Sequence, residues 1–85
     1  MKLVIEKTVA KRLAKLQPAL RAAIMSRLSA IAEAPFAEHP NTKAMVGQQD
    51  LFRLRHGDWR ILYRVVRVAD EVRVLVLEIR GDVYK

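Results

Sequence analysis

The second half of the chain, residues 51–84, alternates between apolar and polar positions in three successive runs. Apolar residues at every second position are typical of a strand that buries one face. The apolar residues that share a face are Phe52 and Leu54 in the first run, Ile61, Tyr63 and Val65 in the second, and Leu75, Leu77 and Ile79 in the third. The pattern therefore predicts three antiparallel strands with one buried face.

Two turns set the expected register of these strands. Gly57-Asp58 suits a two-residue type II′ hairpin with glycine first, which places Arg55 opposite Arg60. The second turn lies near residues 69–71. A slip of one residue would turn a whole strand to the wrong face. We therefore expect a three-residue loop, which keeps the apolar faces matched and places Arg60 opposite Arg80.

This register gathers basic side chains on the other face of the sheet. The predicted row across three strands consists of Arg55, Arg60 and Arg80, with Arg53 one step away on the same face. Like charges directly opposite one another destabilise a sheet. A single strand arginine on a solvated face is more often structural. A row of three, however, indicates that an anionic ligand binds there.

The first half of the chain predicts a short strand and two helices. Residues 2–6 form the strand, and apolar residues at helical spacing predict a helix over residues 8–16. Pro18 suits the first turn of a second helix, which ends near Ala34. We predict one α+β domain over residues 1–85, in the order β-α-α-β-β-β. In it, a helical hairpin packs on one face of a mainly antiparallel sheet.

Composition narrows the function further. The chain has 16 Lys and Arg against 9 Asp and Glu, and its net charge of +7 favours nucleic acid or an acidic protein partner. It has no cysteine, and its two histidines, His39 and His56, are isolated, so no metal and no cofactor is predicted. The N-terminal residues contain no long apolar run. We therefore expect a cytoplasmic protein with no membrane contact.

A set of spaced residues extends from Lys43 to the end of the chain. Its members are Lys43, Met45, Gly47, the run Leu51-Phe52-Arg53-Leu54-Arg55, the run Gly57-Asp58-Trp59-Arg60, Tyr63, and Arg80 and Tyr84 in IRGDVY. The pattern resembles the RelE/ParE superfamily of bacterial type II toxins, and the preceding helical hairpin also matches. The resemblance implies the RelE/ParE-like toxin fold. It also implies a cognate antitoxin protein as partner, in a hetero-oligomer.

The resemblance further implies a site. Members of the RelE branch are ribosome-dependent mRNA endonucleases, in which a cluster of Lys and Arg plus a C-terminal Tyr acts on mRNA in the ribosomal A site. Matched by position, the catalytic residues are Arg55, Arg60, Arg80 and Tyr84. The residues expected to bind RNA are Arg53, Lys43 and Trp59, the last by stacking on an unpaired base. Ile79 stands where many relatives carry His, which argues against a histidine-based mechanism.

The chemistry of such a site needs a base as well as positive charge. RNA is cut when its own 2′-hydroxyl attacks the adjacent phosphate and the 5′-oxygen leaves. Guanidinium groups suit the stabilisation of the phosphate, because they bind its oxygens bidentately. Arginine itself stays protonated and is a poor base. The remaining candidates for the base are Tyr84, Glu78 and His56.

Three functions remain open. The set of arginines with Tyr84 favours a nuclease of the RelE kind. The missing histidine favours a ParE-like toxin, which poisons DNA gyrase, or a toxin-like domain that only binds RNA or a partner. An antitoxin segment is expected to contact the exposed cationic face together with Val74, Val76 and Leu62.

Overall fold

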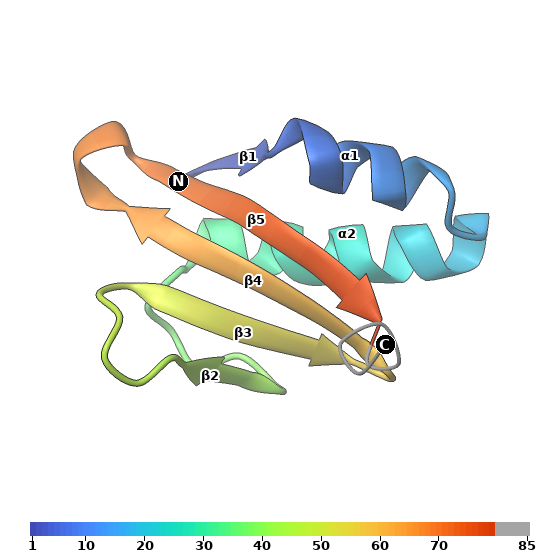
Figure 1. The fold of residues 1–85 in the computed structure, drawn as a ribbon. Helices are drawn as coiled ribbons and strands as arrows, with labels where there is room; N and C mark the ends of the chain where they lie inside the picture. The colour runs from blue at the N-terminus through green and yellow to red at the C-terminus, as the bar shows by residue number, and fades with distance from the viewer. Residues whose placement is uncertain (80–85) are drawn as a thin grey trace.

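Two helices cover one face of a five-stranded sheet (Figure 1). The computed structural model describes residues 1–79, so the predicted site residues Arg80 and Tyr84 lie outside the described residues. The elements in chain order are β1 (Lys2–Ile5), α1 (Lys7–Ala14), α2 (Pro18–Glu33), β2 (Thr42–Ala44), β3 (Leu51–His56), β4 (Trp59–Val66), a 3₁₀ turn (Arg67–Ala69) and β5 (Glu71–Ile79). Across the sheet the order is β1-β5-β4-β3-β2, with β1 parallel to β5 and the other pairs antiparallel.

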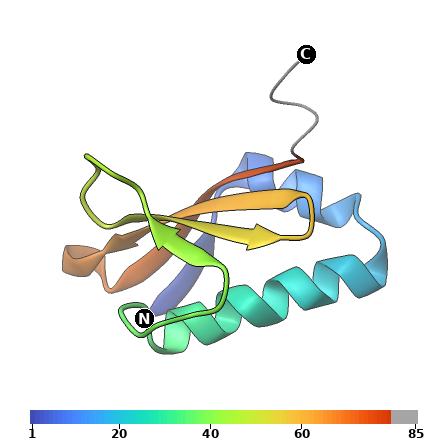
Figure 2. The ribbon, with the colours of Figure 1, turned by 90° about the horizontal axis from the view of Figure 1, so that it is seen from below.

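The α+β class and the helical hairpin are confirmed. The second helix begins at Pro18, where the missing N–H of proline costs no helical hydrogen bond. Figure 2 shows α2 lying along one face of the sheet. The first helix is shorter than predicted and ends at Ala14, where the chain turns toward Pro18.

One strand was not predicted. β2 lies at the edge of the sheet and pairs antiparallel with β3, with Thr42 opposite Leu54 and Lys43 opposite Arg53. Three residues are too few for alternation to show in a sequence. The strand forms because its backbone completes the ladder along β3, and the order is therefore β-α-α-β-β-β-β.

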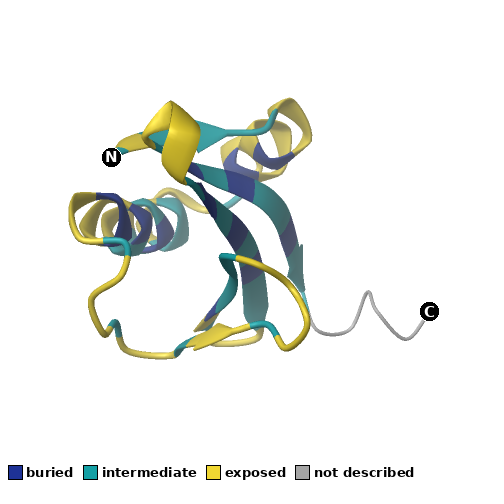
Figure 3. Ribbon diagram, turned by 90° about the vertical axis from the view of Figure 1, so that its left-hand side faces the viewer, coloured by how far each residue is buried: buried dark blue, intermediate teal, exposed yellow. Residues whose placement is uncertain are grey.

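The core lies between the helices and the sheet, where buried residues of both layers meet (Figure 3). Its buried residues are Val9 and Leu13 of α1, Ile24, Leu28, Ile31 and Ala32 of α2, and Leu54, Ile61, Tyr63, Val65, Val72, Val74 and Leu77 of the sheet. Phe52 packs against this cluster, and its ring stacks on that of Tyr63 at 5.3 Å between centroids. Leu54 and Ile61 are fully buried, so the predicted core face of β3 and β4 is confirmed.

The β3–β4 hairpin has the predicted register. Arg55 is opposite Arg60, Arg53 is opposite Leu62, and Gly57 has φ +59°. Asp58 is not among the described residues with positive φ. This combination, with a positive φ at the first turn residue alone, is that of a type II′ turn.

The β4–β5 connection differs from the prediction. It is four residues long, with a 3₁₀ turn followed by Asp70 in the left-handed region at φ +54°. A bulge then interrupts the ladder, because Tyr63 pairs with Val74 whereas Leu62 pairs with Val76. Arg60 consequently faces Glu78 instead of Arg80, and the predicted row of three arginines is wrong in its third member.

The sequence of β5 led to the wrong register because its apolar residues occupy both even positions (Val72, Val74, Val76) and odd positions (Leu75, Leu77, Ile79). Val72 and Val74 are buried near the turn, and Leu77 is buried beyond the bulge. Leu75 is the extra residue of the bulge and stays partly exposed, so its assignment to the core face is wrong. Val74, predicted to contact an antitoxin, is fully buried and unavailable. A bulge of this kind shifts the inward face by one residue.

Leu77→Ala is expected to lower the free energy of unfolding by about 2–5 kcal/mol, because it leaves a cavity in a packed core. Leu77 is 2% exposed and lies opposite Ile61. Leu75→Ala is the matched control on the same strand and should cost less. Urea denaturation of the two variants measures the difference, and equal losses would contradict the observed bulge.

Candidate functional site

A pocket of about 160 Å³ opens on the sheet at the β3–β4 hairpin. It is lined by Arg53, Arg55, Gly57, Asp58 and Arg60. Three of these five residues are arginines. Two of the arginines come from alternate positions of β3, and the third is the second residue of β4. The hairpin therefore brings together three of the basic residues predicted for the site.

The strand register explains why these side chains converge. Arg53 and Arg55 are two residues apart and so project from the same face of β3. Arg60 shares that face, because it is directly opposite Arg55. The Nε of Arg55 also donates a long hydrogen bond, 3.4 Å, to the carbonyl oxygen of Gly57. This contact holds the Arg55 side chain back over the turn.

The pocket has an excess of positive charge. None of its three arginines forms an ion pair with a residue of the described range 1–79. Elsewhere on the sheet, carboxylates do pair with arginines, as for Arg73 with Glu71 at 2.9 Å. The like charges of Arg55 and Arg60 face each other across the strands, which is unfavourable without a ligand. This arrangement suits an anion such as a phosphate.

Glu78 takes the place in the row that was predicted for Arg80. It is directly opposite Arg60 and partly buried. The row across the three strands is thus Arg55, Arg60 and Glu78, two cations followed by a carboxylate. The sequence had offered Glu78 as one of three possible bases. The bulge in β5 is what places it beside the pocket.

The other predicted site residues are distributed around this row. Lys43 is exposed on β2, directly opposite Arg53, so it extends the cationic surface toward the sheet edge. Trp59 packs against the core cluster and is paired with His56. By strand alternation, both lie on the face opposite to Arg60. The structure therefore does not bring Trp59 or His56 into the pocket.

Among residues 1–79 there is no group of three or more His, Cys, Asp or Glu side chains arranged to hold a metal ion. Neither α1 nor α2 combines the length and the apolar character that a membrane-spanning helix needs.

The Nε2 of His39 lies 2.7 Å from the carbonyl oxygen of Ala34, at the end of α2.

Comparison with known families identifies the chain. The sequence profile of the ParE toxin of the type II toxin-antitoxin system parDE matches residues 3–82. The chain belongs to this toxin family. No curated protein sequence matches it significantly. The family assignment of this ParE-family toxin thus rests on a match over nearly the whole chain.

Several solved structures similar to this ParE-family toxin are RelE toxins. The isolated E. coli RelE toxin has a TM-score of 0.79 at 21% identity, over 92% of this chain and 82% of that chain. The archaeal RelE–RelB complex from Pyrococcus horikoshii gives 0.80 at 26% identity, over 94% of both chains. The RelBE2 toxin-antitoxin complex of Mycobacterium tuberculosis gives 0.73 at 23%, over 93% and 96%. The toxin therefore has the RelE-like fold.

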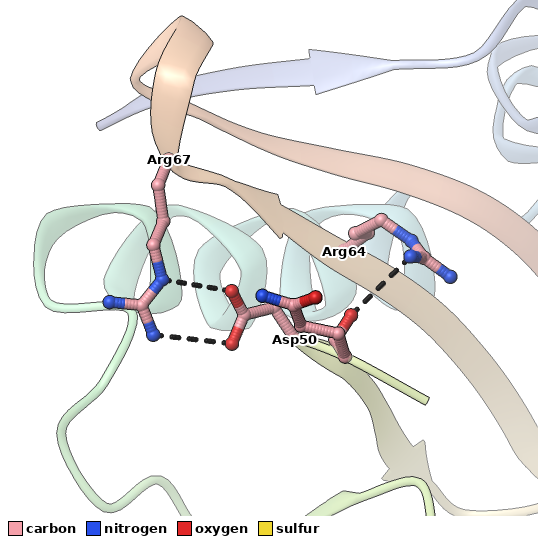
Figure 4. A network of polar contacts seen from close by, with 4 residues as sticks. Asp50, Arg64 and Arg67 are labelled. Atoms are coloured by element: carbon pink, nitrogen blue, oxygen red, sulfur yellow. Dashed lines mark hydrogen bonds and ion pairs between the residues drawn. The ribbon is translucent and has the colours of Figure 1, made fainter. Parts of the chain in front are cut away.

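A second polar cluster of the toxin lies at the other end of β4 (Figure 4). Arg67 binds Asp50 through two hydrogen bonds, of 2.9 and 3.2 Å, and its guanidinium lies 4.2 Å from the ring centre of Phe36. Arg64 donates to the carbonyl oxygen of Gln49 at 3.4 Å. These contacts join the loops before β2 and β3 to the β4–β5 turn.

The sequence carried no signal for the ion pair between Asp50 and Arg67, because the two residues are 17 positions apart in the chain. The hydrogen bond from Arg67 holds the pKa of Asp50 below its usual value. A carboxylate with a lowered pKa stabilises the fold above its unfolded-state pKa, and this contribution is lost as the pH falls. Arg67 is exposed and Asp50 is only partly buried, so this ion pair orients loops more than it stabilises the core.

Tyr63 supplies a prediction at high pH. Burial raises its pKa to about 12, against the opposing effect of a hydrogen bond with Thr42. Because the fold favours the neutral phenol, stability is expected to be present below about pH 10 and to be lost as the pH rises toward 12. Ultraviolet absorbance of tyrosinate during an alkaline titration measures this. Tyr63→Phe removes the late transition, and a Tyr63 that ionises near pH 10 in the folded toxin would contradict the expectation.

Proposed function

We propose that this toxin is a ribosome-dependent mRNA endonuclease that inhibits translation. The single observation that supports the proposal is the pocket, where Arg53, Arg55 and Arg60 converge and form no ion pair with any described residue. Clustered guanidinium groups that are not engaged in ion pairs are suited to bind and stabilise a reacting phosphate. The fold shared with RelE toxins is consistent with this use of the surface.

In the proposed reaction, Arg55 and Arg60 bind the scissile phosphate. As its 2′-hydroxyl neighbour attacks, negative charge develops on the phosphate oxygens, and two fixed guanidinium groups stabilise that charge more than they stabilise the ground state. Arg80 and Tyr84 remain proposed members of the site. Arg53 and Lys43 would hold the RNA backbone on either side, since they lie opposite each other at the sheet edge.

Trp59 keeps its proposed contact with RNA only if the message passes over the edge of the hairpin. Its ring is partly exposed while it packs against the core. A base stacked on its free edge would lie beyond the pocket. Arg55 and Arg60 therefore carry more of the proposal than Trp59 does.

Inhibition of DNA gyrase is the second candidate, favoured by the match to the ParE toxin profile over residues 3–82. In that case the arginine pocket would bind its target without cleaving a phosphodiester bond. The two functions predict different products, cut messages in one case and intact messages with damaged DNA in the other.

Incubation of the purified toxin with ribosomes programmed with a defined message tests the proposal. Cleavage within the codon of the A site, dependent on the presence of the ribosome, is the expected result. Naked message of the same sequence is the control for nonspecific nuclease. Intact message, together with inhibition of gyrase supercoiling by the same preparation, would replace the nuclease with the ParE-like activity.

We also propose a cognate antitoxin as partner, in a hetero-oligomer in the cytoplasm. Several similar structures are complexes of RelE with a RelB antitoxin. On the outer face of this toxin, Leu62 and Val76 are opposite each other and partly exposed, next to the arginine pocket. An acidic, amphipathic antitoxin segment would find apolar contact and opposite charge side by side.

A further inference from the structure

We propose that Glu78 is the general base that takes the proton of the attacking 2′-hydroxyl. The inference rests on the nuclease function proposed above and adds to it the residue that arginine chemistry leaves missing. It depends on the bulge in β5, which moves a carboxylate into the position directly opposite Arg60.

The spacing of the sheet supports this role. Neighbouring strands are about 4.8 Å apart. The backbone of Glu78 is therefore one strand spacing from that of Arg60 and two spacings, about 10 Å, from that of Arg55. Directly opposite residues have Cβ atoms about 4.5–5.5 Å apart. A phosphate bound by Arg55 and Arg60 therefore has the carboxylate at its side. The 2′-hydroxyl next to that phosphate would lie within reach of Glu78.

The chemistry of the neighbours leaves few other proton acceptors. Arg55 and Arg60 remain protonated and cannot serve. His56 is paired with Trp59, which lies on the core face of β4, away from the pocket. Asp58 lines the pocket but is exposed on the hairpin turn. Glu78 is partly buried on a strand, where its position is better defined.

The Glu78 side chain is also free to act as a base. It forms no ion pair and no side-chain hydrogen bond with any residue in the described part of the chain. Glu71, on the same strand, is by contrast bound to Arg73 at 2.9 Å. A carboxylate that lies beside a cation without forming an ion pair with it has free lone pairs. Glu78 is therefore available to accept a hydrogen bond from the substrate.

The proposed step is balanced without a cofactor. Glu78 takes the proton of the 2′-hydroxyl while the 2′-oxygen forms a bond to phosphorus. The bond between phosphorus and the 5′-oxygen breaks, and that oxygen takes a proton from water. Glu78 then returns its proton to water. The products are a 2′,3′-cyclic phosphate and a 5′-hydroxyl.

Glu78→Gln tests the inference because it removes the proton acceptor and keeps the shape of the side chain. Cleavage on programmed ribosomes is expected to slow by about 10²–10⁴-fold, the usual contribution of a general base. Affinity for ribosomes that carry a message with a 2′-deoxy sugar at the cleavage position should be unchanged. The pH dependence of the cleavage rate should differ between the parent and the variant.

Two controls accompany this variant. Glu71→Gln makes the same substitution at the other end of β5 and should cut at the parent rate. Glu78→Asp retains the charge one methylene further from the pocket and should retain partial activity. It also keeps the test decisive if thermal melting shows that Glu78→Gln does not fold.

Several results would overturn the inference. Parent-like cleavage and an unchanged pH profile in a folded Glu78→Gln variant would remove Glu78 from the reaction while leaving the nuclease intact. Loss of activity in Asp58→Asn or Tyr84→Phe, with normal activity in Glu78→Gln, would move the base to the turn or to the C-terminal tyrosine. Absence of ribosome-dependent cleavage by the parent would remove the proposed function itself, and this inference with it.

Discussion

Arg60→Gln is expected to lower ribosome-dependent mRNA cleavage by about 10²–10³-fold, the usual cost of removing one preorganised donor from a transition state. Arg60 occupies the centre of the row, with Arg55 on one side and Glu78 on the other. Glutamine keeps most of the stem but loses the charge that would stabilise the phosphate. The rate of a single turnover with saturating ribosomes is the quantity to measure.

The same substitution should leave the melting temperature nearly unchanged. It removes one repulsion, from Arg55, and one attraction, to Glu78, and each cross-strand pair contributes about 0.2–1 kcal/mol. If Arg80 were opposite Arg60, neutralising Arg60 would raise the stability of the fold. In the observed register the lost repulsion and the lost attraction nearly cancel.

Arg64→Gln is the matched control for Arg60→Gln. Arg64 lies four residues further along the same strand, on the same face, and donates only to the carbonyl oxygen of Gln49 at 3.4 Å among described contacts. Its variant should cut at the parent rate. If both variants cut normally, the pocket is not the site of cleavage. If both lose activity equally, the effect comes from total charge and not from the pocket.

Expression of the toxin without a partner is expected to arrest bacterial growth, and coexpression with the proposed cognate antitoxin should restore growth. This expectation rests on the family match, because the chain belongs to a toxin family of type II toxin-antitoxin systems. If the nuclease proposal is correct, protein synthesis should fall first and messages should be cut within codons. Pulse labelling and mapping of message ends measure these two effects.

The folded Arg60→Gln variant is the control for this experiment. It should allow growth at the same level of expression, since the pocket has lost its central charge. Arrest with intact messages and induced DNA damage would favour gyrase as the target. Normal growth in the presence of abundant, folded parent protein would contradict toxicity altogether.

Local pattern was sufficient for much of the fold. The Gly57-Asp58 turn defined the register of β3 and β4, because a two-residue hairpin with glycine first allows only one pairing. Pro18 located the start of α2, since proline suits that position alone in a helix. Three of the site arginines followed from this hairpin. Their alternation and their turn are both short-range features of the chain.

Tertiary structure decided the rest. Apolar residues stand at both odd and even positions of β5, so alternation did not say which of them face the helices. Burial of Val72, Val74 and Leu77 together requires a bulge at Leu75, because these three are not evenly spaced. Packing against the core overrode regular pairing. As a result, Glu78 and not Arg80 completes the row at the pocket.

The two polar clusters show the same division. The arginine pocket was visible in the sequence because its residues lie within eight positions of one another. The ion pair of Asp50 with Arg67 was not visible in the sequence, since the two residues are brought together only when the loop before β3 meets the β4–β5 turn. Sequence by itself determines contacts across a short turn, where the backbone has few alternatives. Contacts between distant segments depend on how the whole core packs.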